Sequence, residues 1–286
     1  MRVLTATSLV ALAMSVLSAA AGQDAFPQGP PRVRIPAEPS ELLTHSALVS
    51  CQPGDSPGVT VPTPAHVVSW NIRAARSASV DAIASELRAM DADVVALQEV
   101  DMRVRRTGFV DEPAELATAL GFNYAFAASI KWDEGDYGLA VLSRWPLVDV
   151  RRHRLDWTIA GEPRIVLEVT TCVRGRPLRL FNHHADGRVA SRAAGFMEVR
   201  AIVQEQIGRG VLVMGDFNEH AGGPGVRGLI DAGLIDLGAE DSANTADSGR
   251  IDFLLADGAL APRMSRARVW PTDKSDHHAV VADLAW

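Results

Sequence analysis

Five polar clusters adjoin apolar runs in this sequence, and their residue types are those of acid–base and metal chemistry. Four follow such a run and the last precedes one: Asn71, Gln98-Glu99, Asn182-His183-His184-Ala185-Asp186, Asp216-Phe217-Asn218 and Asp276-His277. Residues that leave neighbouring strands meet at one sheet edge, and a cluster that precedes its strand reaches that edge from an antiparallel strand. Every strand must leave the core somewhere, but five clusters rich in Asn, Glu, Asp and His and poor in Lys favour one shared site.

Alternation along the chain sorts the side chains within these clusters. Residues two apart in an extended segment share a face, so His184 lines up with Asn182 and Asp186, while His183 faces away. By the same rule Asp216 and Asn218 share a face, and Phe217 between them turns into the core.

The two histidines near the end of the chain must also diverge. His277 and His278 are adjacent, so only one of them can enter a site at the strand end. We expect His277, beside Asp276, to be the chemical residue and His278 to begin the last strand.

The combined donor set fits a hard divalent cation. Mg²⁺ prefers oxygen ligands and is commonly held by one or two carboxylates together with substrate phosphate. Glu99 is the leading candidate ligand, with Asn71 or Asp276 in support, and Mg²⁺ or Mn²⁺ is the expected ion. Zinc is the weaker choice because the histidines and cysteines lack zinc-site spacing.

The remaining polar groups suit phosphoester hydrolysis, which needs an activated water and donors for developing charge on phosphoryl oxygens. His277 would be the base, oriented by Asp276, and Asn218 and His184 would supply the donors.

The elements that position these residues are many short strands with a few helices between them. Strands are expected at 67–70, 93–97, 124–127, 138–143, 164–172, 177–182, 211–215, 251–255, 267–270 and 278–284, and helices after Ser79, at 113–120 and at 188–207. This pattern predicts an α+β fold, a four-layer α/β/β/α sandwich of two packed mixed sheets with helices outside. The halves 66–160 and 161–286 each contain several strands and a helix, a weak sign of duplication.

Three segments follow from composition along the chain. Residues 1–21 have a basic start, a short apolar centre and small residues before Gly22, as in a secretory signal; an N-terminal membrane anchor is the alternative. Residues 22–64 form a Pro- and Gly-rich extension, and 65–286 the catalytic domain. We therefore expect a secreted or periplasmic protein without a membrane span and monomeric.

Two cysteines, Cys51 and Cys172, are present in the 286 residues. Export to an oxidising compartment predicts a disulfide between them, with two unrelated thiols as the alternative.

The net charge of −7, or −8 once Arg2 leaves with the signal, argues against tight non-specific DNA binding but permits a small phosphate-bearing substrate. The short basic runs at 151–154 and 174–176 are expected to be solvated loops.

Seven motifs, in this order and spacing, resemble the endonuclease/exonuclease/phosphatase superfamily. They are WNI, LQEV, YGLAVLSRWP, FNHHAD, GDFN, RIDFLLA and SDHHAVV, and they cover about residues 66–286. The resemblance implies a metal-binding Glu99 with Asn71 near metal and phosphate, and a terminal acid–base pair, Asp276 and His277. It also implies phosphate-site roles for Tyr137, His184, Asp216 and Asn218. Asp252, in RID, matches a motif of less certain role, and a structural salt bridge is its stronger interpretation.

Two departures from the family pattern leave the shape of the substrate open. Leu139 stands where many bacterial members have Asn, and Ala185 stands where a larger aliphatic residue is usual.

The sequence thus predicts a secreted Mg²⁺-dependent phosphoesterase acting on a small molecule or lipid headgroup. An extracellular nuclease is the alternative within this class. A non-catalytic binding protein on the same scaffold is the alternative of another class.

Overall fold

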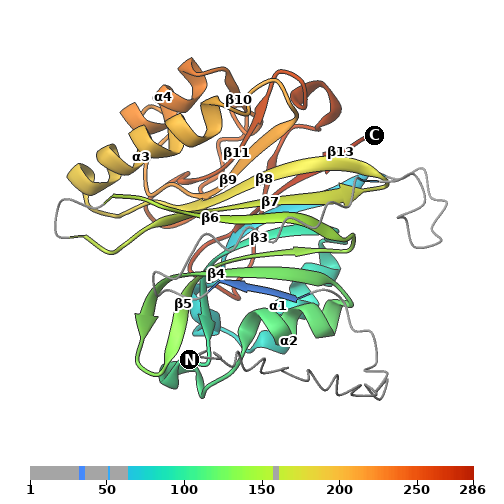
Figure 1. Cartoon of the computed structure of the whole chain (residues 1–286), viewed down its shortest axis with the longest axis vertical. Helices are drawn as coiled ribbons and strands as arrows, with labels where there is room; N and C mark the ends of the chain where they lie inside the picture. The colour runs from blue at the N-terminus through green and yellow to red at the C-terminus, as the bar shows by residue number, and fades with distance from the viewer. Residues whose placement is uncertain (1–31, 36–50, 52–63, 157–160) are drawn as a thin grey trace, which may run out of the picture.

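Two mixed β-sheets pack face to face in the computed structural model, which describes residues 32–35, 51, 64–156 and 161–286. The first sheet has the order β1-β4-β5-β3-β2-β13-β12 and the second the order β10-β11-β9-β8-β7-β6. Helices α1 and α2 cover the outer face of the first sheet, and α3 and α4 that of the second (Figure 1). The predicted four-layer α+β sandwich is confirmed.

The bounds of the strands and helices are as follows. The first sheet contains β1(Arg32–Ile35), β2(Ala65–Asn71), β3(Val94–Met102), β4(Asn123–Trp132), β5(Gly135–Ser143), β12(Arg268–Trp270) and β13(Ala279–Leu284). The second contains β6(Leu147–Arg154), β7(Ile165–Val173), β8(Arg176–His184), β9(Val211–Asp216), β10(Leu234–Asp236) and β11(Asp252–Asp257). The α-helices are α1(Val80–Ala89), α2(Glu112–Leu120), α3(Val189–Gln204) and α4(Pro224–Asp231).

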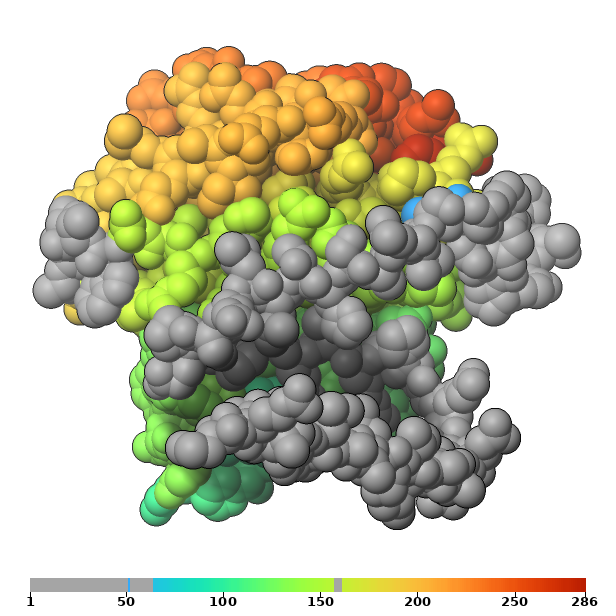
Figure 2. All heavy atoms as spheres, viewed as in Figure 1, coloured from blue at the N-terminus to red at the C-terminus, as the bar shows by residue number. Residues whose placement is uncertain are grey.

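Apolar side chains fill three layers. The central layer lies between the sheets and includes Leu139, Leu167 and Leu180, all buried. Each sheet also packs its other face against its own helices, and Figure 2 shows the orange atoms of the α3 and α4 region forming the outer cap of the second sheet. Because both faces of both sheets are covered, long runs of β3, β5 and β7 are apolar rather than alternating.

The helix starts agree with the sequence. Ser79 Oγ accepts the backbone N–H of Ala82 at 3.2 Å, and Asp111 Oδ1 accepts that of Ala114 at 3.3 Å, so each side chain satisfies a backbone donor that the first turn leaves free. The predicted helix at 188–207 is observed as α3.

Strand β6 corrects one expectation. The basic run 151–154 is not a loop but the end of this edge strand, which pairs antiparallel with β7. Charged side chains on an edge strand hinder pairing with another molecule, so they are compatible with a strand here. Strands β1 and β10 and helix α4 had no clear periodicity in the sequence either.

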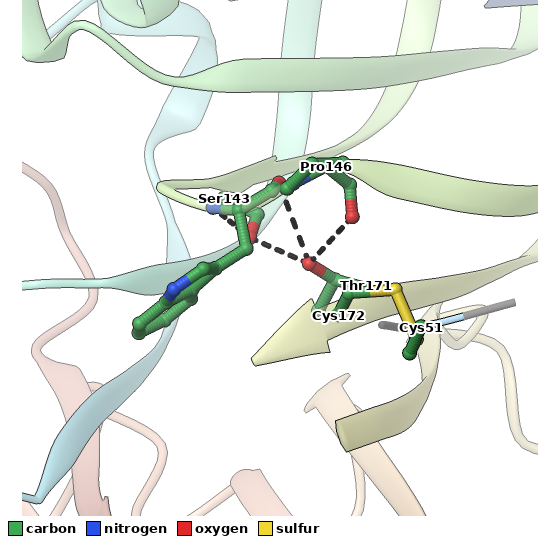
Figure 3. Close-up of a disulfide and its surroundings, with 6 residues drawn as sticks. Cys51, Ser143, Pro146, Thr171 and Cys172 are labelled. Carbon is green, nitrogen blue, oxygen red and sulfur yellow. Dashed lines mark hydrogen bonds between the residues drawn. A yellow bond between two sulfur atoms is a disulfide. The ribbon is translucent and has the colours of Figure 1, made fainter. Parts of the chain in front are cut away.

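The predicted disulfide between Cys51 and Cys172 is present (Figure 3). It joins Cys51, which lies in the sequence between β1 and β2 of the first sheet, to β7 of the second, across a sequence separation of 121 residues. Beside it, the hydroxyl of Thr171 lies 2.8 Å from Ser143 Oγ and donates to Pro146 O at 3.1 Å, which links β7 to the end of β5.

Two expectations concern the N-terminal region and membranes. The predicted signal, residues 1–21, lies outside the described residues, and the predicted extension contributes β1, whose backbone pairs parallel with β4. Among the helices of the described segments, none has the length and apolar character needed to cross a membrane.

Candidate active site

The polar strand ends converge at one edge shared by both sheets. The parallel pairs β2–β3 and β8–β9 end here, where Asn71 is in register with Gln98 and His184 with Asp216. Strands β11 and β13 begin here because each runs antiparallel to its neighbour, β9 and β2. The expectation that His277 reaches this edge from an antiparallel strand is therefore confirmed.

Glu99 stands on an irregularity of β3. The register between β3 and β5 shifts between Leu97 and Val100, and Glu99 has a φ of 53°, in the left-handed region. A bulge of this kind redirects a side chain, and the backbone of a non-glycine residue is strained in this conformation. The distortion directs the Glu99 carboxylate to the site, where Oε1 accepts a hydrogen bond from Asn71 Nδ2 at 3.1 Å.

Asn71 orients two carboxylates. Its Oδ1 accepts the backbone N–H of Arg73 at 3.0 Å, and since that N–H can only donate, the amide nitrogen must face the other way. Nδ2 accordingly donates to Glu99 and, at 3.0 Å, to Asp216 Oδ2. Asn71 lies at the predicted place, but its oxygen is occupied by the backbone, so the structure favours a positioning role over metal ligation.

Asp216 lies at the centre of the site and is almost fully buried. Gly215 before it has a φ of 142°, and a Cβ there would lie 1.8 Å from His183 O, so only glycine allows the two strands to approach this closely. Asp216 Oδ1 accepts the backbone N–H of Asn218 at 2.9 Å. Burial and the neighbouring Asp252 carboxylate raise the pKa of Asp216.

His184 is held as a neutral imidazole. Arg164 Nη1 lies 3.0 Å from its Nδ1, and since a guanidinium only donates, Nδ1 accepts and the ring proton resides on Nε2. Nε2 faces Asp216 Oδ2 at 3.4 Å and Asn218 Nδ2 at 3.1 Å. Burial, then the charge of Arg164, lowers the pKa of His184 well below its usual range. The ring is thus a neutral hydrogen-bond donor, the kind of group expected here.

His277 is oriented by an unexpected acid. Its Nδ1 lies 2.9 Å from Asp252 Oδ2, and its Nε2 lies 3.7 Å from Asp216 Oδ2. The prediction that Asp276 orients His277 is therefore corrected: the acid at Nδ1 is Asp252, and the ion pair of Asp252 is with a residue of the site. Burial is the largest single influence and opposes the charged imidazole, but the hydrogen bond to Asp252 and the negative charges of Asp252, Asp216 and Asp276 together outweigh it and raise the pKa of His277 to about 9.

Asp276 turns toward the rim of the site instead. Its Oδ2 lies 3.2 Å from Arg73 Nε, and both side chains are about half exposed. The chain direction explains this, because neighbouring residues at a strand start point to opposite sides, and His277 takes the inward position.

Tyr137 borders the site from β5. Its ring lies 5.2 Å from the guanidinium carbon of Arg106, which is itself fixed by two 2.7 Å hydrogen bonds to Asp101. Burial and then the charge of Glu99 raise the pKa of Tyr137, so its hydroxyl keeps its proton at neutral pH. It is available as a donor near Glu99.

The side chains expected to face away do so. His183 is buried, contacts Ile165 O at 3.0 Å and packs near Phe217 with ring centroids 6.4 Å apart. Burial lowers the pKa of His183 to about 4. His278 Nδ1 meets the backbone of Thr272, so the face assignment of His277 and His278 is confirmed.

Asn182 and Asp186 do not act with His184, although they share its face. Asn182 bridges the two sheets, since its Nδ2 donates at 2.9 Å to Leu97 O and to Ala140 O. Asp186 accepts the backbone N–H of Arg188 before α3. Of the two departures, Leu139 packs between the sheets, and Ala185 is buried and offers its carbonyl to Asn218 Nδ2.

A group that could hold a metal ion is present. Asp216, Asp252 and His277 each offer a ligand atom, and these atoms lie within 4.8 Å of one another. Asp252 Oδ1 is buried without a hydrogen-bond partner in the described part of the chain, so this oxygen could serve as a ligand atom for a cation. Together with Glu99, this oxygen-rich set fits a hard divalent cation.

Sequence reasoning missed three contributors. Asp252 was named but given another role, Arg164 carries no motif, and Thr245 lies in a loop. Thr245 Oγ1 accepts the backbone N–H groups of Ile251 and Asp252 at 3.0 and 3.1 Å, and so fixes the start of β11. The RID motif at the start of a strand was the one available signal.

Comparison with known proteins identifies the family of the chain. The family model described as Endonuclease/Exonuclease/phosphatase family matches residues 68–277, from β2 to the last histidine of the site. Among curated proteins, the uncharacterized protein YbhP of Escherichia coli is 27% identical over 218 residues, covering 69% of this chain and 85% of that protein.

Solved structures share the fold. A mannosyl-6-phosphatase of Bacteroides thetaiotaomicron superposes with a TM-score of 0.61 at 18% identity, covering 78% of this chain and 100% of the other. A 3′ phosphatase of Neisseria bound to a product DNA hairpin gives the same TM-score, identity and coverage.

Proposed function

Because the chain belongs to the Endonuclease/Exonuclease/phosphatase family, we propose that it is an exported, divalent-metal-dependent phosphoesterase. The observation that carries the proposal is the convergence of Glu99, Asp216 and the Asp252–His277 pair at one sheet edge. These four groups come from four strands: Glu99 from the bulge of β3, Asp216 from the end of β9, Asp252 from the start of β11, and His277 from just before β13. The disulfide supports export, since such bonds persist in oxidising compartments.

Glu99 remains the predicted metal ligand, with Asp216 beside it through the shared amide of Asn71. Asp276 can contribute only if it leaves Arg73. A divalent cation, Mg²⁺ or Mn²⁺, would offset phosphoryl charge in the transition state, and its own charge would lower the pKa of His277.

His277 takes the proton of the attacking water. Asp252 holds Nδ1, so Nε2 is the nitrogen that faces Asp216 and the cleft. The water oxygen bonds to phosphorus, its proton passes to Nε2, and the bond from phosphorus to the leaving oxygen breaks. That oxygen then takes up a proton and departs as the alcohol.

The donors for the phosphoryl oxygens come from the second sheet, at and just after the ends of β8 and β9. The Nε2–H of neutral His184 and the amide of Asn218 are held in place by Arg164 and Ala185 O before any substrate arrives. Preorganised donors of this kind stabilise charge that develops in the transition state. Tyr137, protonated at neutral pH, adds a third donor beside Glu99.

The test is a metal-dependent activity panel on the purified protein. The substrates are p-nitrophenyl phosphate, bis-p-nitrophenyl phosphate, inositol phosphates, sphingomyelin and plasmid DNA. We expect activity on at least one, abolished by EDTA, restored by Mg²⁺ or Mn²⁺, and nearly lost in Glu99→Ala. Glu115→Ala, an exposed acid of α2, is the matched control and should be fully active.

Two results would contradict the proposal. Full activity after EDTA treatment would exclude the metal. Inactivity on every ester, while circular dichroism shows that the protein is folded, would favour the alternative of a non-catalytic binding protein. Activity confined to plasmid DNA would identify the nuclease alternative, which the net charge of −7 disfavours.

A further inference from the structure

The turn after β2 has an unusual backbone. Arg73, Ala74 and Ala75 have φ values of 52°, 50° and 45°, three successive non-glycine residues in the left-handed region. Single residues visit this region, and a run of three persists only where the surroundings impose it. Backbone strain of this kind concentrates at functional sites, so the turn is a place to look for a functional side chain.

The surroundings that impose the turn belong to the active site. Asn71 Oδ1 accepts the backbone N–H of Arg73 at 3.0 Å, and Asn71 O accepts Ser275 Oγ–H at 2.7 Å. Ile72 N donates to Gln98 O at 3.1 Å, which ties the turn to the end of β3 beside Glu99. The turn is therefore rigidly placed between the loop that carries His277 and the strand that carries Glu99.

This backbone places the Arg73 guanidinium at the rim of the site. It contacts Asp276, the residue before His277, through Nε at 3.2 Å, and the two side chains are 44% and 47% exposed. Exposed ion pairs contribute little to stability, so the guanidinium can exchange this carboxylate for another anion at small cost.

The other arginines near the site are already committed. Arg164 contacts His184 Nδ1 at 3.0 Å and Glu162 at 3.1 Å, and its side chain is mostly buried. Arg106 is held by both oxygens of Asp101. Arg76 follows Arg73 by three residues and lines a cavity of about 510 Å³ together with Ser79, Arg106 and Glu115.

We propose that Arg73 determines specificity by binding the terminal oxygens of a phosphomonoester, which makes the protein a phosphatase rather than a phosphodiesterase. The inference rests on the proposed function of the same site. A monoester brings two negative charges to a site lined by Glu99, Asp216 and Asp252, whereas a diester brings one. A guanidinium, which matches two phosphate oxygens at once, supplies the extra fixed positive charge.

The first experiment compares two esters in matched variants. Arg73→Ala should lower kcat/KM for p-nitrophenyl phosphate by about 30-fold or more, with no more than about a 3-fold change for bis-p-nitrophenyl phosphate. Arg73→Lys should recover part of the loss, because it restores charge without the planar fork. Arg76→Ala is the control and should leave both rates unchanged. Equal losses on both esters, or no loss in Arg73→Ala, would overturn the inference.

The second experiment needs no turnover. Isothermal calorimetry with inorganic phosphate, in the presence of Mg²⁺, should show about 10-fold weaker binding in Arg73→Ala and unchanged binding in Arg76→Ala. If the unmodified protein hydrolyses no ester, the proposed function fails, and this titration still judges Arg73 separately. Identical phosphate affinity in Arg73→Ala and the unmodified protein would refute the role.

Discussion

Two β–α–β units form the two sides of the active site, and they position their side chains by different means. In the first sheet, α1 connects the parallel strands β2 and β3; in the second, α3 connects the parallel strands β8 and β9. Each unit delivers polar side chains from the ends of its strands. The sign of duplication in the sequence corresponds to this shared arrangement.

The first unit relies on a distorted backbone. Glu99 at a bulge and the Arg73–Ala75 turn all have positive φ, without a glycine among them. The second unit has one such residue, Asn218 at φ 48°, and relies mainly on hydrogen bonds of the side chains of His184 and Asp216. It places a glycine, Gly215, where its two strands approach closely.

The side chains on the two sides of the site also differ in their exposure to solvent. The side chains of Arg73 and Asp276 at the first unit's rim are about half exposed, whereas those of His184 and Asp216 are 7% and 2% exposed. The first side therefore suits groups that exchange partners when metal and substrate bind. The second suits fixed hydrogen-bond donors, which are oriented before substrate binds.

The sharpest test of the buried network concerns the two adjacent histidines. His277→Ala should lower kcat at least about 100-fold, because a positioned base contributes about 10²–10⁴ in rate. His278→Ala should stay within about tenfold, since the Nδ1 atom of its ring contacts the backbone of Thr272. The measurement is steady-state kinetics of both purified variants, with circular dichroism as the folding control. Inactivity of His278→Ala with active His277→Ala would reverse the assignment.

The second test addresses Asp252. A base must be neutral. The pKa of His277 is raised to about 9 by its acidic neighbours, and a bound cation would lower it from there, so the rate should climb with pH, with a midpoint below 9, as the imidazolium loses its proton. Asp252→Asn removes the main cause that raises this pKa, so the midpoint of the rise should move to lower pH. The pH dependence of kcat measures it.

Asp276→Asn is the matched control for this shift. The Asp276 carboxylate also raises the pKa of His277, but it is the last of the contributions and makes no hydrogen bond to the ring, so its loss should move the midpoint less. A midpoint that stays unchanged in Asp252→Asn would show that a group other than His277 controls the profile.

The sequence predicted the elements with strong periodicity and clear caps. The strands that carry Asn71 and Asp216 and the helices that begin after Ser79 and Asp111 are found close to their expected bounds, whereas the strand expected at 93–97 continues past Glu99 to Met102. Strand β6 was missed because the four basic residues at its end show no alternation of apolar and polar side chains. The strand forms through its pairing with β7, and local sequence does not predict that long-range contact.

In the site, alternation correctly separated His184 from His183 and His277 from His278. It could not identify the partner of His277, because Asp252 lies 25 residues away in the sequence. The two residues meet because β11, antiparallel to β9, and β13, antiparallel to β2, begin at the same edge of the two sheets. Sequence adjacency favoured Asp276, and alternation itself argues against that choice, since neighbours in extended chain diverge. The Arg73–Asp276 pair depends on three successive residues in the left-handed region of backbone conformation. A sequence indicates that conformation mainly through glycine, and none of the three is a glycine.

The smallest expected effect tests whether the first unit really stores backbone strain. A non-glycine residue in the left-handed region destabilises the folded state by about 1–2 kcal/mol, and a glycine there avoids this strain. The glycine offsets about 0.5–1 kcal/mol of the gain, because the unfolded chain has more conformational freedom at a glycine. Ala75→Gly, at φ 45°, should therefore raise the free energy of unfolding by about 0.5–1 kcal/mol in urea titrations. Ala82→Gly, inside α1, should lower it by about 1 kcal/mol and serves as the control. If Ala75→Gly destabilises the protein as much as Ala82→Gly does, the turn carries no strain, and the contrast between the two units rests on their hydrogen bonds alone.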